Sequence, residues 1–159
     1  MAKTESKGRY PLKIALVHDW LTGMRGGERC LEVFCELFPE ADLFTLLYQQ
    51  GRLSPTIARM QIYTSLLQLL PFSTRYYRYF LPILPLAIRQ FELSEYNLIL
   101  SSSHAVAKGM RHRNYTRHIC FCFTPMRYSW DQSHVYFPRD KIHPLAWVFL
   151  QALLRYLRA

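Results

Sequence analysis

Six residues suited to acid–base chemistry or anion binding lie in three separate parts of this chain, each after an apolar stretch. They are Asp19 and Arg25, His104 and Lys108, and Arg127 and Asp131. Such a mixture suits a polar, multi-hydroxyl or phosphorylated ligand, and we expect Asp19, His104 and Asp131 to be catalytic. His104 would transfer a proton or hydrogen-bond a ligand hydroxyl, unless its ring only bonds the backbone of its own loop.

Residues 14–28 predict a buried strand, a glycine-rich turn and the start of a helix. Ile14–Val17 is a short apolar run typical of a parallel strand covered on both faces, and helical spacing follows from Gly27 to Phe38. A helix start after a strand presents free N–H groups and a positive dipole end to anions. We therefore expect phosphate to be bound by these residues: Gly23, Arg25, Gly26, Gly27 and Lys108. The alternative is that the glycines only form a tight turn.

The spacing of these glycines disfavours a nicotinamide dinucleotide. That fingerprint needs G-x-G-x-x-G and an acidic residue at the end of the second strand. Here the glycines stand at 23, 26 and 27, and the second strand is followed by Gln49 and Gln50. We expect no cofactor.

Strand and helix patterns alternate along the rest of the chain, which predicts an α/β domain with a Rossmann-like, mainly parallel sheet flanked by helices. Further strands are expected at 41–48, 60–63, 95–101 and 117–123, and helices at 53–58, 64–70, 75–91 and 145–157. Pro82 and Pro85 should kink or break the helix at 75–91 near residues 81–85. In such a sheet the stretches 19–28, 101–109 and 123–131 meet at the carboxyl ends of the strands.

Length and composition are those of one domain with an ample core, since 50% of the 159 residues are hydrophobic. We assign residues 13–159 to this domain and residues 1–12 to a flexible tail. The tail lacks the apolar stretch of a secretory signal, and no uncharged apolar run approaches the roughly 20 residues of a membrane span. We expect a cytoplasmic protein, with peripheral association at the inner membrane face as an option.

The four cysteines agree with a reducing compartment. Cys30 and Cys35 fall on the first helix and Cys120 and Cys122 on a strand, where buried, reduced thiols are the default expectation. His118 would share a strand face with Cys120 and Cys122, yet no fourth ligand follows at zinc spacing. We expect no metal.

Positive charge is concentrated after residue 50, where fourteen Lys and Arg face four Asp and Glu. Basic residues alternate with tyrosine in Arg75–Phe80 and gather again at Lys108–His118. These clusters could contact nucleic acid or a lipid headgroup layer, or form a solvated helix face. We expect no nucleic-acid partner, because no recognition helix, RNP signature or zinc-finger spacing accompanies them.

Three linked motifs carry a resemblance to a known family. They are His18-Asp-Trp-Leu-Thr22 with Gly26-Gly-Glu28, Ser101-Ser-Ser-His-Ala-Val-Ala-Lys-Gly109, and Thr124-Pro-Met-Arg-Tyr-Ser-Trp-Asp131. From about Lys13 onward the chain resembles the amino-terminal half of bacterial glycosyltransferase family 4 proteins. The resemblance implies a GT-B fold of two Rossmann-like domains. It also implies retaining, metal-independent transfer of a sugar from a nucleotide-sugar to a saccharide or lipid-linked acceptor in envelope polysaccharide synthesis.

By this resemblance the chain supplies the acceptor surface and the glycine-rich loop facing the donor phosphates. We assign acceptor binding to these residues: Arg75, Arg78, Arg127, Tyr128 and Trp130. The nucleotide would belong to a second domain that we expect to be absent, so the chain should be inactive alone. The aromatic-basic stretch Arg75–Phe80 suggests a lipid-linked acceptor.

The sequence departs from the family pattern at Phe123, where relatives commonly have a histidine near the reacting sugar. Phenylalanine cannot accept a hydrogen bond from a hydroxyl or stabilise positive charge as imidazole does. A non-catalytic module that binds a saccharide or a partner therefore remains an alternative, and a basic nucleic-acid-binding protein is a weaker one. The closing helix at 145–157 either packs within the domain or exposes apolar surface to a partner.

Overall fold

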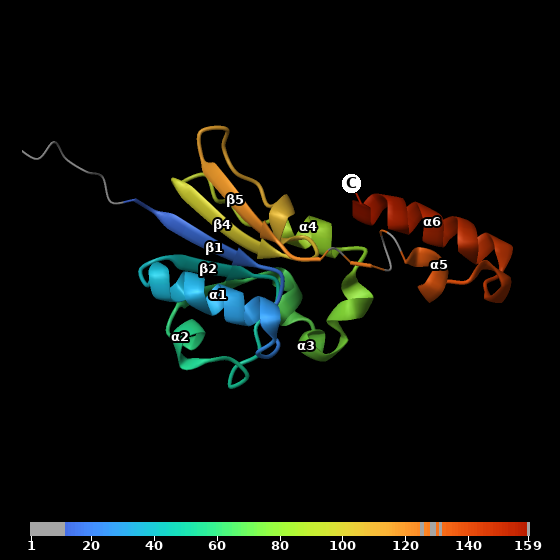
Figure 1. Ribbon diagram of the computed structural model, residues 1–159, viewed down its shortest axis with the longest axis horizontal. Coiled ribbons are helices and arrows are strands. Elements are labelled where there is room, and N and C mark those ends of the chain that lie inside the picture. Colours follow the sequence, from blue (N-terminus) through green and yellow to red (C-terminus); the bar gives the residue numbers. More distant parts are fainter. Residues whose placement is uncertain (1–11, 125, 128–129, 131, 159) are drawn as a thin grey trace, which may run out of the picture.

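A five-stranded parallel sheet organises the chain, with strand order β3-β2-β1-β4-β5 (Figure 1). The computed structural model describes residues 12–124, 126, 127, 130 and 132–158. Strand β1 (Ile14–His18) lies at the centre, between β2 (Asp42–Thr45) and β4 (Leu98–Ser103), and β3 (Gln61–Thr64) and β5 (Arg117–Cys122) form the edges. All four strand pairs are parallel. The expected α/β, Rossmann-like fold is confirmed.

Helices α1 (Gly26–Leu37) and α2 (Pro55–Ala58) connect β1, β2 and β3 in turn, and the chain then crosses to the other side of β1 to enter β4. The strand order therefore reverses between β1 and β4. Loops leave these neighbouring strands in opposite directions, so a crevice forms at their carboxyl ends, which is the usual ligand position in open α/β sheets.

Apolar side chains cover the two faces of the sheet in separate clusters. The face under α1 and α2 is built on residues such as Leu16, Leu31, Leu43 and Ile57. The opposite face packs Val17, Phe44 and Ile99 against the segment between β3 and β4. Strand β1 contributes alternate residues to both clusters, because neighbouring side chains of a strand point to opposite faces. Because both faces of β1 are buried, the position of this central strand, which carries the candidate site, is well defined.

The segment between β3 and β4 is a series of short helical turns, and the break predicted near residues 81–85 is confirmed. The turns are η1 (Leu66–Leu69), α3 (Ser73–Tyr76), η2 (Tyr77–Phe80) and α4 (Leu84–Ile88). Pro82 precedes α4 and Pro85 stands in its first turn, where the missing proline N–H costs no helical hydrogen bond. Phe72, before α3, has a left-handed backbone with φ 55°.

Strand β5, at the carboxyl-terminal edge of the sheet, is more exposed to solvent than the sequence predicted. Strand β5 follows η3 (Ala107–Gly109), and its Ile119, Cys120, Phe121 and Cys122 are exposed, because among the described residues no helix covers it fully. The expectation of buried cysteines is thus wrong for this strand and correct for Cys35, whose burial raises the pKa of its thiol to about 12.

Helix α6 (Pro144–Arg158) follows α5 (Ser133–Tyr136) and the turn η4 (Arg139–Lys141), and these elements project beyond the carboxyl end of the sheet (Figure 1). Leu154 is buried and Leu157 packs against the core, whereas Leu145, Val148 and Phe149 are exposed. The closing helix therefore packs on the domain near its carboxyl end and exposes apolar side chains near its amino end. Among the described helices, none combines the length and apolarity needed to cross a bilayer.

Candidate functional site

A cleft of about 770 Å³ lies at the carboxyl ends of β1 and β4, where the strand order reverses. Its walls come from the glycine-rich turn, the loop after β4, the chain after β5 and the helical turns between β3 and β4. The lining residues are His18, Trp20, Arg25, Gly26, Gly27, Glu28, Tyr77, Leu81, His104, Phe123, Thr124, Met126, Arg127 and Tyr136. The three stretches that the sequence predicted to converge do meet here, in so far as their residues are described.

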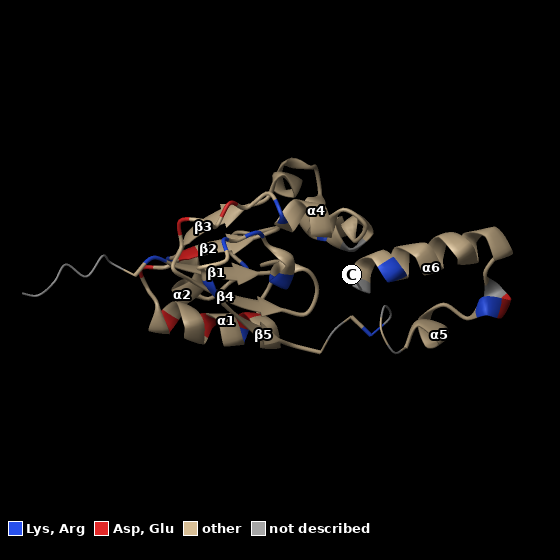
Figure 2. Ribbon diagram, turned by 90° about the horizontal axis from the view of Figure 1, so that it is seen from above, with Lys and Arg blue, Asp and Glu red and all other residues tan. Residues whose placement is uncertain are grey.

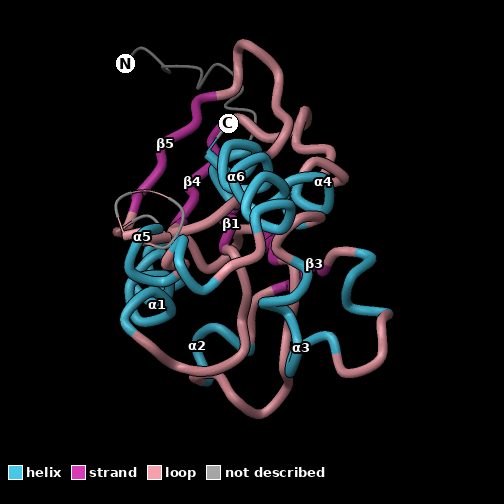
Figure 3. The backbone as a smooth tube through the Cα atoms, turned by 90° about the vertical axis from the view of Figure 1, so that its right-hand side faces the viewer, coloured by secondary structure: helices cyan, strands magenta, loops and turns pink. Residues whose placement is uncertain are grey.

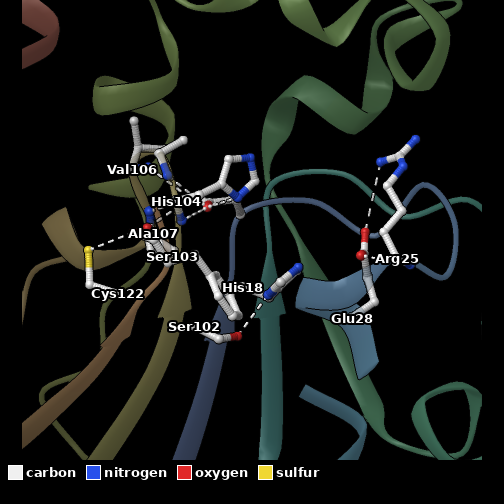
Figure 4. Close-up of polar contacts among 12 residues, drawn as sticks. His18, Arg25, Glu28, Ser102, Ser103, His104, Val106, Ala107 and Cys122 are labelled. Carbon is white, nitrogen blue, oxygen red and sulfur yellow. Dashed lines mark hydrogen bonds and ion pairs between the residues drawn. The ribbon is translucent and has the colours of Figure 1, made fainter. Parts of the chain in front are cut away.

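Asp19 anchors the loop that follows β4. Figure 4 labels His104, Val106 and Ala107 of this loop and marks its polar contacts with dashed lines. The Asp19 carboxylate is completely buried and accepts hydrogen bonds from four successive backbone N–H groups, those of His104, Ala105, Val106 and Ala107, at 2.7–3.0 Å. The Ser103 hydroxyl donates a further bond at 3.2 Å. Successive N–H groups that converge on one anion form a nest, here filled by a side chain of the protein itself.

These contacts keep Asp19 ionised. Burial by itself raises the pKa of a carboxyl, but the hydrogen bond and charge of His104, together with His18 and the loop N–H groups, outweigh it and lower the pKa of Asp19. Asp19 does not line the cleft, and its oxygens face the loop. The sequence predicted Asp19 to be catalytic, whereas the structure places it outside the cleft lining, where it shapes the loop and orients His104.

His104 reaches the cleft with a fixed ring. Its Nδ1 lies 3.1 Å from Asp19 Oδ2, and its ring packs edge-on against Trp20 with centroids 4.6 Å apart. When Nδ1 carries the proton donated to Asp19, the other nitrogen, Nε2, is an acceptor. The half-buried ring borders the cleft, so it can take a hydrogen bond or a proton from a bound hydroxyl.

His18 is a second histidine of the site, which sequence reasoning quoted within a motif without giving it a role. It ends β1 beside Ser102, and its buried Nδ1 lies 2.7 Å from the Ser102 hydroxyl. Burial lowers its pKa, despite the opposing charges of Asp19 and Glu28, so the ring is neutral at pH 7. The available signal was its place next to Asp19 at the end of a buried strand.

The start of α1 forms another wall of the cleft. Glu28 is buried and its Oε2 accepts a hydrogen bond of 3.1 Å from the Arg25 backbone N–H, which closes the first turn. Among the described residues, the N–H groups of Gly26 and Gly27 have no hydrogen-bond partner. Together with the exposed Arg25 they provide hydrogen-bond donors and a positive potential for an anion. The Glu28 carboxylate, which lies near Arg25, lowers this potential.

The three glycines of this turn differ in what they permit. A Cβ on Gly27 would lie 3.4 Å from His18 Cε1 and 3.5 Å from the Phe123 ring, whereas one on Gly23 or Gly26 would meet nothing within 4 Å. Gly27 thus allows α1 to approach the sheet closely. Gly23 and Gly26 leave open space through which a ligand can approach the backbone.

Several predicted residues lie away from the cleft. Lys108 and Trp130 border a neighbouring hollow of about 240 Å³ on the other side of the His104 loop, which shares His104 and Met126 with the cleft. Arg75 is exposed and lies over the Tyr76 ring, outside the cleft lining. Tyr128, Asp131 and the Arg78 side chain are outside the described residues. The aromatic-basic stretch instead contributes Tyr77, which packs on Trp20 at 4.8 Å between centroids.

Phe123 stands in the cleft wall at the position where the sequence departs from the family pattern. Its ring faces Gly27 and contacts Phe121, with centroids 5.2 Å apart. An apolar surface therefore occupies this part of the wall.

Comparisons of the chain with models of known protein families, with curated proteins and with solved structures find no match. Within the described part of the chain, no group of three or more His, Cys, Asp or Glu side chains is placed to hold a metal ion.

Proposed function

We propose that this chain is the acceptor-side domain of a GT-B glycosyltransferase, which transfers a sugar from a nucleotide-sugar to a saccharide or lipid-linked acceptor in envelope polysaccharide synthesis. The observation that carries the proposal is the ring of His104, which lines the cleft and is oriented by the buried Asp19 carboxylate. This cleft lies where open α/β sheets usually bind ligands. The motif resemblance to family 4 glycosyltransferases supplies the reaction.

The geometry suits the charges that develop in such a reaction. Breaking a glycosyl–phosphate bond builds positive charge on the sugar and negative charge on the departing diphosphate. The free N–H groups of Gly26 and Gly27, with Arg25, are donors suited to that phosphate. His104 Nε2 is an acceptor suited to a sugar hydroxyl. Neutral His18 adds a polar ring without a competing positive charge.

One domain provides only one wall for this chemistry. Transfer needs a closed, dry site, and the present cleft is open. We therefore expect weak binding of acceptor and phosphate and no transfer by the chain alone. The nucleotide-sugar would be held by a second domain, and the protein would act in the cytoplasm, at the inner membrane face when the acceptor is lipid-linked.

A second candidate is a non-catalytic module that binds a saccharide or a partner, and Phe123 is the observation that favours it. The phenylalanine ring gives the cleft an apolar wall where a histidine would assist the reacting sugar. Binding by His104 and Arg127 would persist while turnover fell. In a fusion of the chain to a nucleotide-sugar-binding domain, Phe123→His would then raise transfer, whereas measurable and equal transfer by wild type and Phe123→His would remove this candidate.

The test of phosphate binding is a titration of ¹⁵N-labelled protein with inorganic pyrophosphate, followed by amide chemical shifts. We expect the Gly26 and Gly27 amides to shift with an affinity of about 1 mM, and Arg25→Gln to weaken it about fivefold, since a charge-assisted hydrogen bond is lost. Arg59→Gln is the matched control, because Arg59 is exposed at the end of α2, remote from the cleft lining.

Two outcomes would contradict the proposal. One is a shift pattern centred on Lys108 rather than on the α1 start, since that would place the anion behind the His104 loop. The other is equal pyrophosphate affinity in wild type, Arg25→Gln and Arg59→Gln. Duplex DNA added in place of pyrophosphate should bind no more tightly than net charge predicts and should not shift Gly27, which separates a nucleic-acid binder from a sugar-transfer domain.

A further inference from the structure

The short helical turns between β3 and β4 expose an unusual number of large apolar side chains. Within residues 66–86, here called the 66–86 segment, eight such side chains are 41–80% exposed. They are Leu66, Leu69, Leu70, Phe72, Tyr76, Tyr79, Ile83 and Leu86. Its helices α3 and α4 lie toward the carboxyl end of the sheet, next to the candidate site (Figures 1 and 3). Exposed apolar surface on this scale marks a contact surface.

The exposed residues are not part of a poorly packed core. Each turn of the segment already buries its own inward residues, such as Leu67, Tyr77 and Leu84. The remaining positions face outward, where a helix on a soluble domain normally carries charged and polar residues. Here those positions carry leucine, isoleucine, phenylalanine and tyrosine.

The charge of this region has one sign. Residues 66–91 contain three arginines, at 75, 78 and 89, and no lysine, aspartate or glutamate. Figure 2 shows acidic residues along α1 and none along α4. Pairing of this region with the same region of a second copy would bring like charges together. An apolar surface with arginine and tyrosine at its borders matches an anionic membrane, since arginine meets lipid phosphates and tyrosine lies at the headgroup level.

We propose that the 66–86 segment docks on the surface of an anionic lipid bilayer. Leucine, phenylalanine and tyrosine side chains such as Leu69, Phe72 and Tyr79 enter the headgroup and upper acyl region, and the arginines stay at phosphate level. Arg75 lies 5.7 Å from the Tyr76 ring centroid, so this guanidinium is held beside a ring of the docking surface. The segment lies on the membrane without crossing it.

Docking in this position places the cleft at the membrane. Tyr77 and Leu81 of the segment line the cleft itself, and Pro85 lines the hollow that holds Arg89 and Lys108. A substrate anchored in the same bilayer would reach the His104 loop from this side. This part of the inference, that the acceptor is lipid-linked, rests on the proposed function, whereas the docking itself does not.

The experiment is sedimentation of the full chain with vesicles of phosphatidylcholine alone or mixed with phosphatidylglycerol. We expect binding to the mixed vesicles, weaker binding to the neutral ones, and a partial loss in high salt, because part of the affinity is electrostatic. Leu69→Ser/Tyr79→Ser should lower the affinity about tenfold or more, since two inserted side chains are lost. Both residues are highly exposed, so folding should be unaffected.

Ile119→Ser/Phe121→Ser is the matched control, because it removes two exposed apolar side chains from β5 instead. A second pair of variants tests the contribution of charge to vesicle binding. Here Arg75→Gln/Arg89→Gln is the test variant and Arg111→Gln/Arg113→Gln is its control. Three outcomes would overturn the docking surface. The first is an equal loss of vesicle binding in test and control variants, and the second is binding that depends on Arg111 and Arg113. The third is a protein that does not bind vesicles and forms a dimer, which Leu69→Ser/Tyr79→Ser converts to a monomer. Vesicle binding without a pyrophosphate site would leave docking supported and contradict only the proposed function.

Discussion

The centre of the sheet and the 66–86 segment reverse the usual distribution of polar and apolar groups. At the centre, Asp19, His18 and three serines of β4 are buried, and they find partners within the chain. In the 66–86 segment, leucine and tyrosine side chains lie in solvent without cover. Buried polar groups persist because each is hydrogen-bonded, whereas exposed apolar groups gain nothing from the isolated fold. The first region is explained by the domain itself and the second by what the domain contacts.

The largest expected effect comes from breaking the centre at Asp19. Asp19→Asn replaces an acceptor of several N–H bonds by an amide whose NH₂ group faces other donors, so the free energy of unfolding should fall by about 3–5 kcal/mol. Urea unfolding measures this as a lower midpoint. Glu95→Gln, which loses an exposed ion pair with Lys13, is the control and should cost under about 1 kcal/mol. Similar losses in both variants would mean that the loop does not depend on Asp19.

Helix α4 offers a direct comparison of inward and outward leucines. Leu84 is fully buried and Leu86 is 62% exposed, two residues apart on the same short helix. Leu84→Ala should cost about 2–4 kcal/mol of unfolding free energy, and Leu86→Ala under about 0.5 kcal/mol. Thermal and urea unfolding of both variants would test this. A large loss from Leu86→Ala would show that this side chain supports the fold and would weaken the docking surface.

The close approach of α1 to the sheet can be tested at Gly27. Gly27→Val places branched carbon against His18 and the Phe123 ring, so overpacking should cost about 1–3 kcal/mol. Gly26→Ala is the control, because a Cβ there meets nothing and alanine favours the helix. Its melting temperature should be unchanged or higher. Equal melting of Gly27→Val and wild type would indicate that α1 sits farther from β1.

The smallest effect is a pH dependence that His18 gives to the centre. Burial lowers the pKa of His18, so below about pH 6.5 the unfolded chain binds a proton that the folded chain rejects. Stability is therefore complete above that pH and falls as the pH drops, by at most about 1.4 kcal/mol per unit. The lowered pKa of Asp19 contributes only as the pH falls below about 4.

Urea unfolding of His18→Gln between pH 7 and 5 should show a flatter dependence than wild type. His118→Gln is the comparison, since burial and nearby His112 also lower the pKa of that half-buried ring. We expect the smaller flattening there. A slope that only His118→Gln changes would contradict a buried neutral His18.

The sequence predicted the sheet because apolar runs and glycine or proline signals recur in strand–helix alternation. It also predicted that Asp19, Arg25, His104 and Arg127 meet, because parallel strands bring their carboxyl ends to one edge. The role of Asp19 could not be read in this way. Its partners are backbone N–H groups, which every residue carries and no residue type reveals.

Two further differences have local causes. Lys108 is the middle residue of the 3₁₀ turn η3, where it borders the neighbouring hollow rather than the cleft. Tyr77 reaches the cleft because residues 73–88 form separate short turns, α3, η2 and α4, and a continuous helical period would not predict its direction. The exposure of β5 depends on which helices reach the sheet edge, and strand patterning carries no such information.

At Phe72 the 66–86 segment loses stability in order to expose an apolar side chain. Its left-handed backbone costs a residue with a Cβ about 1 kcal/mol relative to glycine, and its side chain, 73% exposed, recovers little of this by burial. Phe72→Gly should therefore make the isolated domain more stable and the vesicle-bound form weaker. Stability and docking would then oppose each other at a single residue. Selection of variants for thermal stability alone would therefore favour variants that bind membranes more weakly.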